Sequence, residues 1–199
     1  MIKAIIFDLN GVFIKAPKLS DRFKEEFGIL PDEFIPVLKS ILVKVRMPKA
    51  NDYFIYWKPY LDKWGVNLTK EQFFDFWSKT EKENPEMIEL ARQIKSKGIK
   101  IFILSNNFVE RANYYKQNFP FLEEIFNKIY YSFETGFVKP NPEAYKKLLA
   151  DNNLQSEECI YFDDSAENVE TANNLGIKSF LFEGADKTRG ILGLLTVKF

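Results

Sequence analysis

The chain begins with a short apolar run that stops at an acidic side chain. Residues 4–7 read Ala-Ile-Ile-Phe, and Asp8 follows directly. An apolar run ended by a turn signal is typical of a parallel-sheet strand that is buried on both faces, and Asn10 and Gly11 supply such a turn. Ligands of parallel sheets bind at the carboxyl ends of the strands. Asp8 is therefore a candidate nucleophile or metal ligand; the alternative is an aspartate that only caps the turn.

Later segments repeat this arrangement and alternate with helical patterns. Further strands are predicted at 100–104, 130–133, 159–162 and 178–182, the second of them weaker than the others. Helices are predicted at 85–97, 108–119, 142–152 and 166–175. Strands that alternate with helices indicate βαβ units. We therefore expect an α/β fold with a Rossmann-like parallel sheet and helices on both of its faces.

Polar groups suited to phosphate follow these strands. Ser105 follows the second strand, Lys139 follows the third, and Asp163 and Asp164 end the fourth. The order of these residues and the segments 138–145 and 161–168 resemble the haloacid dehalogenase-like hydrolase superfamily, whose four motifs occur in the same order along the chain. The resemblance covers residues 1–14 and about 85–183. It is strongest to the small phosphatases, including the phosphatase domain of soluble epoxide hydrolases.

Residues 15–84 interrupt the alternation. They show no convincing strand, and their helical stretches are broken near Gly28–Pro31, Met47–Pro48 and Gly65–Asn67. The resemblance implies that this segment is a helical cap, inserted between the first and second motifs of a catalytic core formed by residues 1–14 and 85–199. A cap would exclude water from the site and select the leaving group.

The predicted cap is rich in aromatic residues. Four of its apolar residues have the spacing of a core-facing helix stripe, namely Phe54, Trp57, Leu61 and Trp64. Burial in the core of the cap is the simpler interpretation of this stripe. The functional alternative is that a few of the aromatic side chains line a substrate pocket.

The resemblance implies roles for the motif residues. Asp8 would attack phosphorus to form an aspartyl-phosphate, and the expected catalytic set is Asp8, Asn10, Ser105 and Lys139. The expected phosphate-binding set is Ser105, Asn106, Lys139 and Gly11, with the backbone N–H groups of Asn106 and Asn107 at a helix start. Magnesium would be held by Asp8, Asp164 and the backbone carbonyl of Asn10. Asp163 and Asn168 would support these ligands from behind. An alternative for Asp164 is a capping box with Glu167.

Asn10 departs from the family pattern, which places a second aspartate at this position as the general acid and base. An amide neither donates a labile proton nor acts as a base near neutrality. Three interpretations fit this departure: a slow phosphatase, a phosphate-binding or regulatory module with an impaired site, or a variant made to trap the phosphoenzyme. Deamidation of Asn10, which precedes Gly11, would restore an acid with age. A dehalogenase is a weaker alternative, because the Asp163–Asp164 pair indicates a metal that halide displacement does not need.

Composition narrows the function further. The 199 residues carry 28 basic and 28 acidic side chains, so no basic field is expected to attract nucleic acid or an anionic membrane. The chain contains no histidine, which excludes histidine acid–base chemistry, and its single cysteine fits a reducing cytoplasm. No apolar run is long enough to span a membrane. We expect a small phosphorylated metabolite as the substrate; the sequence leaves its identity and the oligomeric state open.

Overall fold

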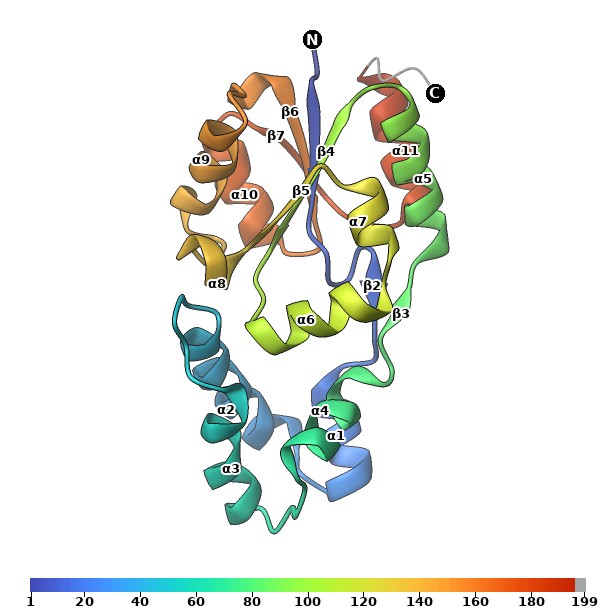
Figure 1. Cartoon of the computed structure of the whole chain (residues 1–199). Coiled ribbons are helices and arrows are strands. Elements are labelled where there is room, and N and C mark those ends of the chain that lie inside the picture. The colour runs from blue at the N-terminus through green and yellow to red at the C-terminus, as the bar shows by residue number, and fades with distance from the viewer. Residues whose placement is uncertain (196–199) are drawn as a thin grey trace.

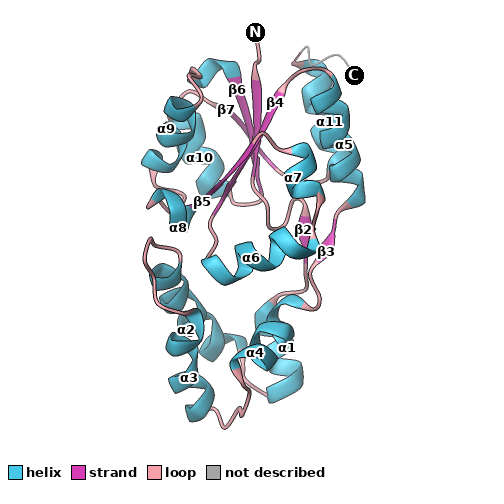
Figure 2. Cartoon of the chain, in the orientation of Figure 1, coloured by secondary structure: helices cyan, strands magenta, loops and turns pink. Residues whose placement is uncertain are grey.

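The computed structural model of the chain describes residues 1–195. Its center is a five-stranded parallel sheet with the strand order β5-β4-β1-β6-β7 (Figures 1 and 2). The strands are β1 (Ala4–Phe7), β4 (Lys100–Ser105), β5 (Lys128–Tyr131), β6 (Cys159–Asp163) and β7 (Lys178–Leu181). The predicted α/β fold with a Rossmann-like parallel sheet is confirmed.

Helices pack against both faces of this sheet. One face carries α5 (Pro85–Ser96), α7 (Phe121–Ile125) and α11 (Ala185–Leu194), and the other carries α9 (Pro142–Asp151) and α10 (Ala166–Asn174). Successive side chains of β1 point to opposite faces, so Ile5 packs in one apolar cluster and Ile6 in the other. This burial on both faces explains why β1 reads as an unbroken apolar run rather than as an alternating one.

Four further helices form a separate group below the carboxyl ends of the strands (Figure 1). They are α1 (Leu19–Phe27), α2 (Pro31–Val45), α3 (Tyr53–Lys63) and α4 (Lys70–Ser78). Trp57 and Leu61 are fully buried in the aromatic core of this group, whereas Phe54 and Trp64 are partly buried around it. The apolar stripe of α3 therefore packs in the core of this group, as the simpler interpretation predicted. Helix α6 (Val109–Asn118) lies between this group and the sheet.

The short strands differ from the prediction in two places. The strand expected at 130–133 lies at 128–131, and α8 (Ser132–Thr135) follows it. The buried hydroxyl of Ser132 bonds the backbone of Asn107 in both directions, at 3.0 and 3.1 Å, and thereby ends the strand. The second difference is an antiparallel pair of two-residue strands, β2 (Ile14–Lys15) and β3 (Lys82–Glu83), where no strand was expected. Two residues are too few to show a periodicity.

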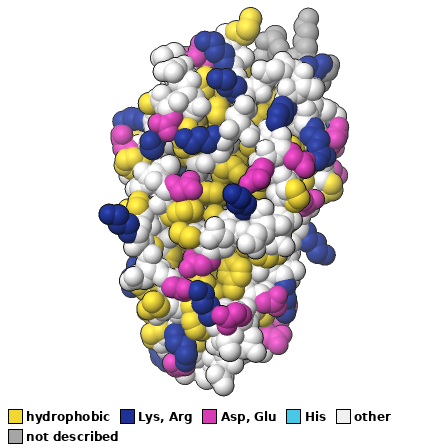
Figure 3. All heavy atoms as spheres, viewed as in Figure 1, with side chains coloured by type: hydrophobic (Ala, Val, Ile, Leu, Met, Phe, Trp, Pro, Cys, Tyr) yellow, Lys and Arg dark blue, Asp and Glu magenta, His cyan; other side chains and the backbone are white. Residues whose placement is uncertain are grey.

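The single cysteine and the surface bear on the other expectations. Cys159 is fully buried, and burial raises the pKa of its thiol to about 12. Within residues 1–195, no helix has the length and apolar character that crossing a membrane requires. On the face shown in Figure 3, basic and acidic side chains are interspersed rather than gathered by sign.

Candidate active site

Two carboxylates and one ammonium group converge at the carboxyl edge of the sheet. Strands β1 and β6 are neighbors, so Asp8 and Asp163 leave the sheet side by side. The Nζ atom of Lys139 lies 2.8 Å from Asp8 Oδ1 and 2.6 Å from Asp163 Oδ2, and it is 3.0 Å from the hydroxyl oxygen of Tyr161. All of these groups are buried. The ammonium group thus balances two negative charges that are withdrawn from water.

The backbone of Lys139 is held by Asn106. The Asn106 amide donates to the Lys139 carbonyl at 2.8 Å, and its carbonyl oxygen accepts from the Lys139 N–H at 2.7 Å. The Asn106 side chain therefore positions the lysine, and only its backbone remains for the predicted phosphate contact. The N–H of Asn107 donates to Ser132 and α6 begins at Val109, so the expected pair of N–H groups at a helix start is wrong for Asn107.

The hydroxyl of Ser105 has no hydrogen-bond partner among the described residues, 1–195, although it is buried. It ends β4, next to the β1 strand that carries Asp8. A buried polar group without a partner costs free energy, and a ligand that accepts its hydrogen bond removes that cost. A phosphate oxygen is such an acceptor.

Asp163 is enclosed by donors. The Asn168 amide lies 3.0 and 3.1 Å from its two oxygens, the N–H of Ser165 donates at 2.8 Å, and the Tyr161 hydroxyl donates to Oδ2. Burial acts to raise the pKa of Asp163, but Lys139 and these hydrogen bonds outweigh it, so the pKa lies below the usual range. Asp163 and Asn168 therefore form a fixed, charged support behind the other groups.

Three carboxylates could share a metal ion. Asp8, Asp163 and Asp164 each offer an oxygen, and the three oxygens lie within 4.8 Å of one another. Burial raises the pKa of Asp8 to about 6, with the charges of Asp163 and Asp164 adding to it and Lys139 opposing. Burial and then Asp163 also raise the pKa of Asp164. Oxygen donors that repel one another in this way fit a hard divalent cation such as Mg²⁺.

Asp164 does not cap the following helix. Ser165 occupies the N-cap position of α10, and no side chain there accepts a capping hydrogen bond. The capping box considered for Asp164 and Glu167 is therefore absent. The Asp164 side chain is exposed and lines a pocket, where it remains available to a ligand.

Gly11 provides the space for Asp164. Its φ of +86° favors glycine, and a Cβ atom at this position would overlap the Asp164 carboxylate. We expect Gly11→Ala to lower the free energy of unfolding by about 1–3 kcal/mol and to weaken Mg²⁺ binding, because it combines backbone strain with a clash. Chemical denaturation and calorimetric Mg²⁺ titration measure the two effects. Gly193→Ala, in a helix with open space around the position, is the control and should be neutral or mildly stabilizing. An unchanged Mg²⁺ affinity of Gly11→Ala would contradict the prediction.

The raised pKa of Asp8 predicts that this group weakens the metal-free fold at neutral pH. Its usual pKa is 3.8, so between that value and about 6 the folded protein binds more protons than the unfolded chain does. The contribution of Asp8 to stability therefore falls as the pH rises through this window. We expect Asp8→Asn to raise the melting temperature of the metal-free protein at about pH 7, and to have little effect at about pH 4. Thermal unfolding in a chelator measures this, with the exposed Asp186→Asn as the control. A lower melting temperature of Asp8→Asn at neutral pH would refute it.

Asn10 belongs to a hydrogen-bonded chain that the sequence did not reveal. Its amide donates to the Tyr115 hydroxyl at 2.6 Å, and that hydroxyl donates to Glu81 Oε1 at 3.1 Å. The Arg111 Nε atom donates to the same Glu81 oxygen at 2.8 Å. Tyr115 and Arg111 lie on α6, and Glu81 lies between α4 and β3. The sequence predicts a helix that contains Tyr115, but only the docking of α6 onto the end of β1 brings its hydroxyl to Asn10.

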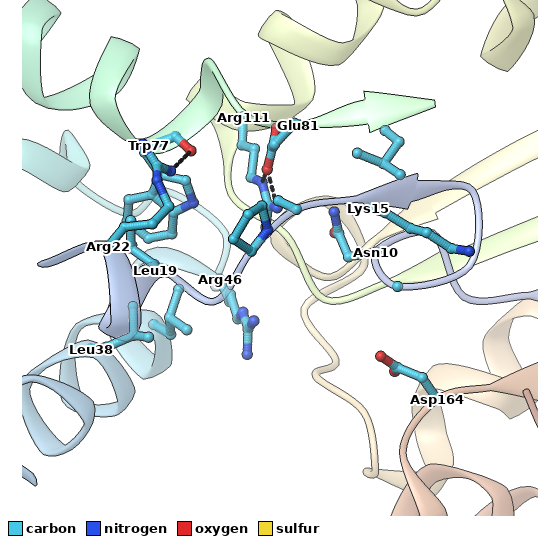
Figure 4. Close-up of a pocket in the computed structure, with 15 residues that line it drawn as sticks. Asn10, Lys15, Leu19, Arg22, Leu38, Arg46, Trp77, Glu81, Arg111 and Asp164 are labelled. Carbon is cyan, nitrogen blue, oxygen red and sulfur yellow. Dashed lines mark hydrogen bonds and ion pairs between the residues drawn. The ribbon is translucent and has the colours of Figure 1, made fainter. Parts of the chain in front are cut away.

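A pocket of about 480 Å³ lies between the sheet and the group α1–α4 (Figure 4). Asn10, Gly11 and Asp164 contribute to its wall from the sheet side, and Arg22, Arg46 and Trp77 contribute from the helices. This volume is within the range of small-molecule sites, about 300–1,000 Å³. Two of the candidate metal ligands, Asn10 and Asp164, thus border a cavity large enough for a small metabolite.

The fold and this site define a hydrolase of the haloacid dehalogenase type. The haloacid dehalogenase-like hydrolase family matches residues 2–176, and the chain belongs to this family.

Among relatives, this chain is 29% identical to mouse acyl-CoA dehydrogenase family member 10, with 83% of this chain aligned. It is 25% identical to mouse bifunctional epoxide hydrolase 2, with 90% of this chain aligned. It spans only 13% and 36% of those two proteins. It is 26% identical to a phosphorylated carbohydrates phosphatase of Thermotoga maritima, with 89% of the chain and 83% of that protein aligned.

Solved structures agree on the fold. A haloacid dehalogenase family enzyme of Bacteroides thetaiotaomicron matches with a TM-score of 0.79 and 23% identity, covering 96% of this chain and 98% of that one. A predicted hydrolase of Porphyromonas gingivalis matches with a TM-score of 0.79 and 24% identity over 100% of both chains. The Bacteroides enzyme has also been crystallized with magnesium and inorganic phosphate.

Proposed function

We propose that the chain is a Mg²⁺-dependent phosphomonoesterase that acts through an aspartyl-phosphate on a small phosphorylated metabolite. The observation that carries this proposal is the placement of the Asp8 carboxylate 2.8 Å from Lys139 Nζ and close to Asp164, which lines the pocket. The similarity to a phosphorylated carbohydrates phosphatase supports the reaction class. Residues 1–14 and 85–199 would form the catalytic core, and residues 15–84 the cap. We propose the cytoplasm as the location of the protein, and the free, buried thiol of Cys159 is compatible with that reducing compartment.

The residues divide the reaction between them. An Asp8 oxygen would attack phosphorus while the bond from phosphorus to the leaving oxygen breaks, and water would later hydrolyze the resulting acyl phosphate. Lys139 and the Ser105 hydroxyl would bind the equatorial oxygens, on which negative charge spreads in the transition state. When bound by Asp8, Asp164 and the Asn10 carbonyl, Mg²⁺ would reduce the repulsion between carboxylate and phosphate. Asp163 would hold Lys139 in place.

Asn10 should affect the two steps of this reaction differently. A leaving group that departs as a stable anion needs no proton, whereas the hydrolysis of the acyl phosphate needs a base that an amide does not supply. The chain should therefore release the first product from a good substrate and then stall as the phosphoenzyme. The Asn10 amide instead donates to the Tyr115 hydroxyl at 2.6 Å.

The test is the time course with p-nitrophenyl phosphate. In the presence of Mg²⁺ we expect a burst of about one p-nitrophenolate per chain, followed by slow turnover. Intact mass spectrometry should show the added phosphoryl group, and both signals should vanish in EDTA and in Asp8→Asn.

The rival function is a phosphate-binding module of the same fold, which Asn10 alone favors. It predicts no burst and no added mass in the native chain, with Mg²⁺-dependent binding of phosphate retained. That result, obtained also with Asn10→Asp, would overturn the phosphatase proposal.

A further inference from the structure

Arg46 is one of the cations in the wall of the pocket. It is the C-cap residue of α2, next to the break at Met47–Pro48. Its Nε atom is buried and makes no hydrogen bond, and within residues 1–195 its guanidinium forms no ion pair. Figure 4 shows the side chain extending into the open part of the pocket, with no dashed line to any neighbor.

The other arginines of the pocket are satisfied by the protein itself. Arg22 donates to the backbone carbonyls of Trp77, at 3.1 Å, and Phe76. Arg111 forms an ion pair with Glu81. Lys15 also lines the pocket but is exposed, so water solvates its ammonium group. Arg46 therefore differs from the other cations of this pocket: its side chain is half-buried with the Nε atom fully buried, and residues 1–195 offer it neither a hydrogen-bond acceptor nor a counter-charge.

The surroundings make the bare charge costly. Burial, with repulsion from Arg111 acting in the same direction, lowers the pKa of Arg46 to about 10, and attraction to Asp8 opposes these two effects. A buried charge without a partner costs several kcal/mol at most sites, and an anion that forms two hydrogen bonds with the guanidinium offsets this cost. A favorable interaction with the carbonyl end of α2 explains an arginine at this helix end, but it leaves the Nε atom unsatisfied.

We propose that Arg46 binds a second anionic group, a carboxylate or a phosphate, on the leaving-group side of the substrate. This inference rests on the proposed function, since the phosphoryl group to be cleaved is taken to lie at Asp8 and Lys139. The substrate class is then a phosphomonoester whose alcohol part is itself anionic. In Figure 4 Arg46 and Asp164 border the open part of the pocket from different sides, so one small molecule would extend from the phosphoryl site toward the guanidinium.

The test compares two phosphonates that cannot be hydrolyzed. Phosphonoacetate carries a carboxylate, and 2-hydroxyethylphosphonate carries a hydroxyl at the same distance. By calorimetric titration in excess Mg²⁺, we expect the wild-type protein to prefer phosphonoacetate by about tenfold or more. Arg46→Met should remove this preference and leave the affinity for 2-hydroxyethylphosphonate within about twofold. A third probe, 1,2-ethylenebisphosphonate, decides between a carboxylate and a phosphate as the better second anion.

Two further variants keep the test decisive. Lys44→Met removes a charge from the same end of α2 but outside the pocket, where Lys44 lies over the Tyr56 ring, and it should keep the full preference. Arg46→Lys, which keeps the charge and loses the paired hydrogen bonds, should keep part of it, and it replaces Arg46→Met if that variant does not fold. A wild-type protein without preference, or a preference unchanged in both Arg46 variants, overturns the inference.

Failure of the proposed function gives a different result. Binding of the phosphonates requires no turnover. A chain that shows no burst with p-nitrophenyl phosphate, yet keeps an Arg46-dependent preference for phosphonoacetate, would refute the phosphatase and retain the second anion site.

Discussion

Replacing Lys139 with methionine should abolish phosphoenzyme formation and lower the free energy of unfolding by about 3–5 kcal/mol at neutral pH. The substitution leaves Asp8 and Asp163 buried and close together without the ammonium group that now lies 2.8 and 2.6 Å from them. The loss of stability should shrink as the pH falls, because a protonated carboxyl no longer needs a counter-charge, and the pKa of Asp8 is already raised to about 6. Urea denaturation at several pH values measures this dependence.

The control for this variant is Lys146→Met. Lys146 is exposed and pairs with Glu143 within a single helix, so its removal should change the free energy of unfolding by less than about 0.5 kcal/mol. If the two variants were equally stable, the buried ion pairs of Lys139 with Asp8 and Asp163 would contribute nothing to the stability of the fold.

Replacing Asn10 with aspartate should raise steady-state phosphate release by about a hundredfold to ten-thousandfold, the usual contribution of a general acid and base. The burst of p-nitrophenolate should disappear, because hydrolysis of the acyl phosphate no longer lags behind its formation. The new carboxyl group takes the place of the amide that now donates to Tyr115, so only its protonated form preserves that hydrogen bond. This preference should raise its pKa above that of an ordinary aspartate.

The measurement is the pH profile of turnover beside that of the burst. Tyr115→Phe in the Asn10→Asp background is the informative partner, since it removes the hydroxyl and keeps the ring that packs against Phe119. It should shift the acidic limb of the profile and leave phosphoenzyme formation intact. An Asn10→Asp protein as slow as the native chain would mean that the missing acid does not limit the reaction.

Much of the fold could be predicted because its signals are local. The apolar runs of β1, β4 and β6 and the turn residues after them are contiguous in sequence, and a parallel sheet brings such strand ends to one edge. For this reason Asp8, Lys139 and Asp163 were expected together, and they lie together. Their catalytic roles stay predictions.

The remaining residues of the site depend on how helices dock. Arg46, Glu81 and Arg111 lie outside the motifs, on or near helices whose orientation toward the pocket no periodicity specifies. The role of the Asn106 side chain is not predictable for a related reason: its amide holds the backbone of Lys139, which is 33 residues away in the sequence. The only available signal for Arg46 was a basic residue directly before the break at Met47–Pro48.

The burial of Cys159 makes the chain suitable for site-specific labeling. The chain has one thiol, it is fully buried, and its high pKa keeps it in the unreactive protonated form. The folded protein without introduced cysteines should therefore not react with maleimide reagents. Cysteines introduced at the exposed Val43 on α2 and Val109 on α6 would be the sole positions to accept fluorophores. Energy transfer between such a pair would report directly whether the two parts of the molecule approach each other when a phosphonate enters the pocket.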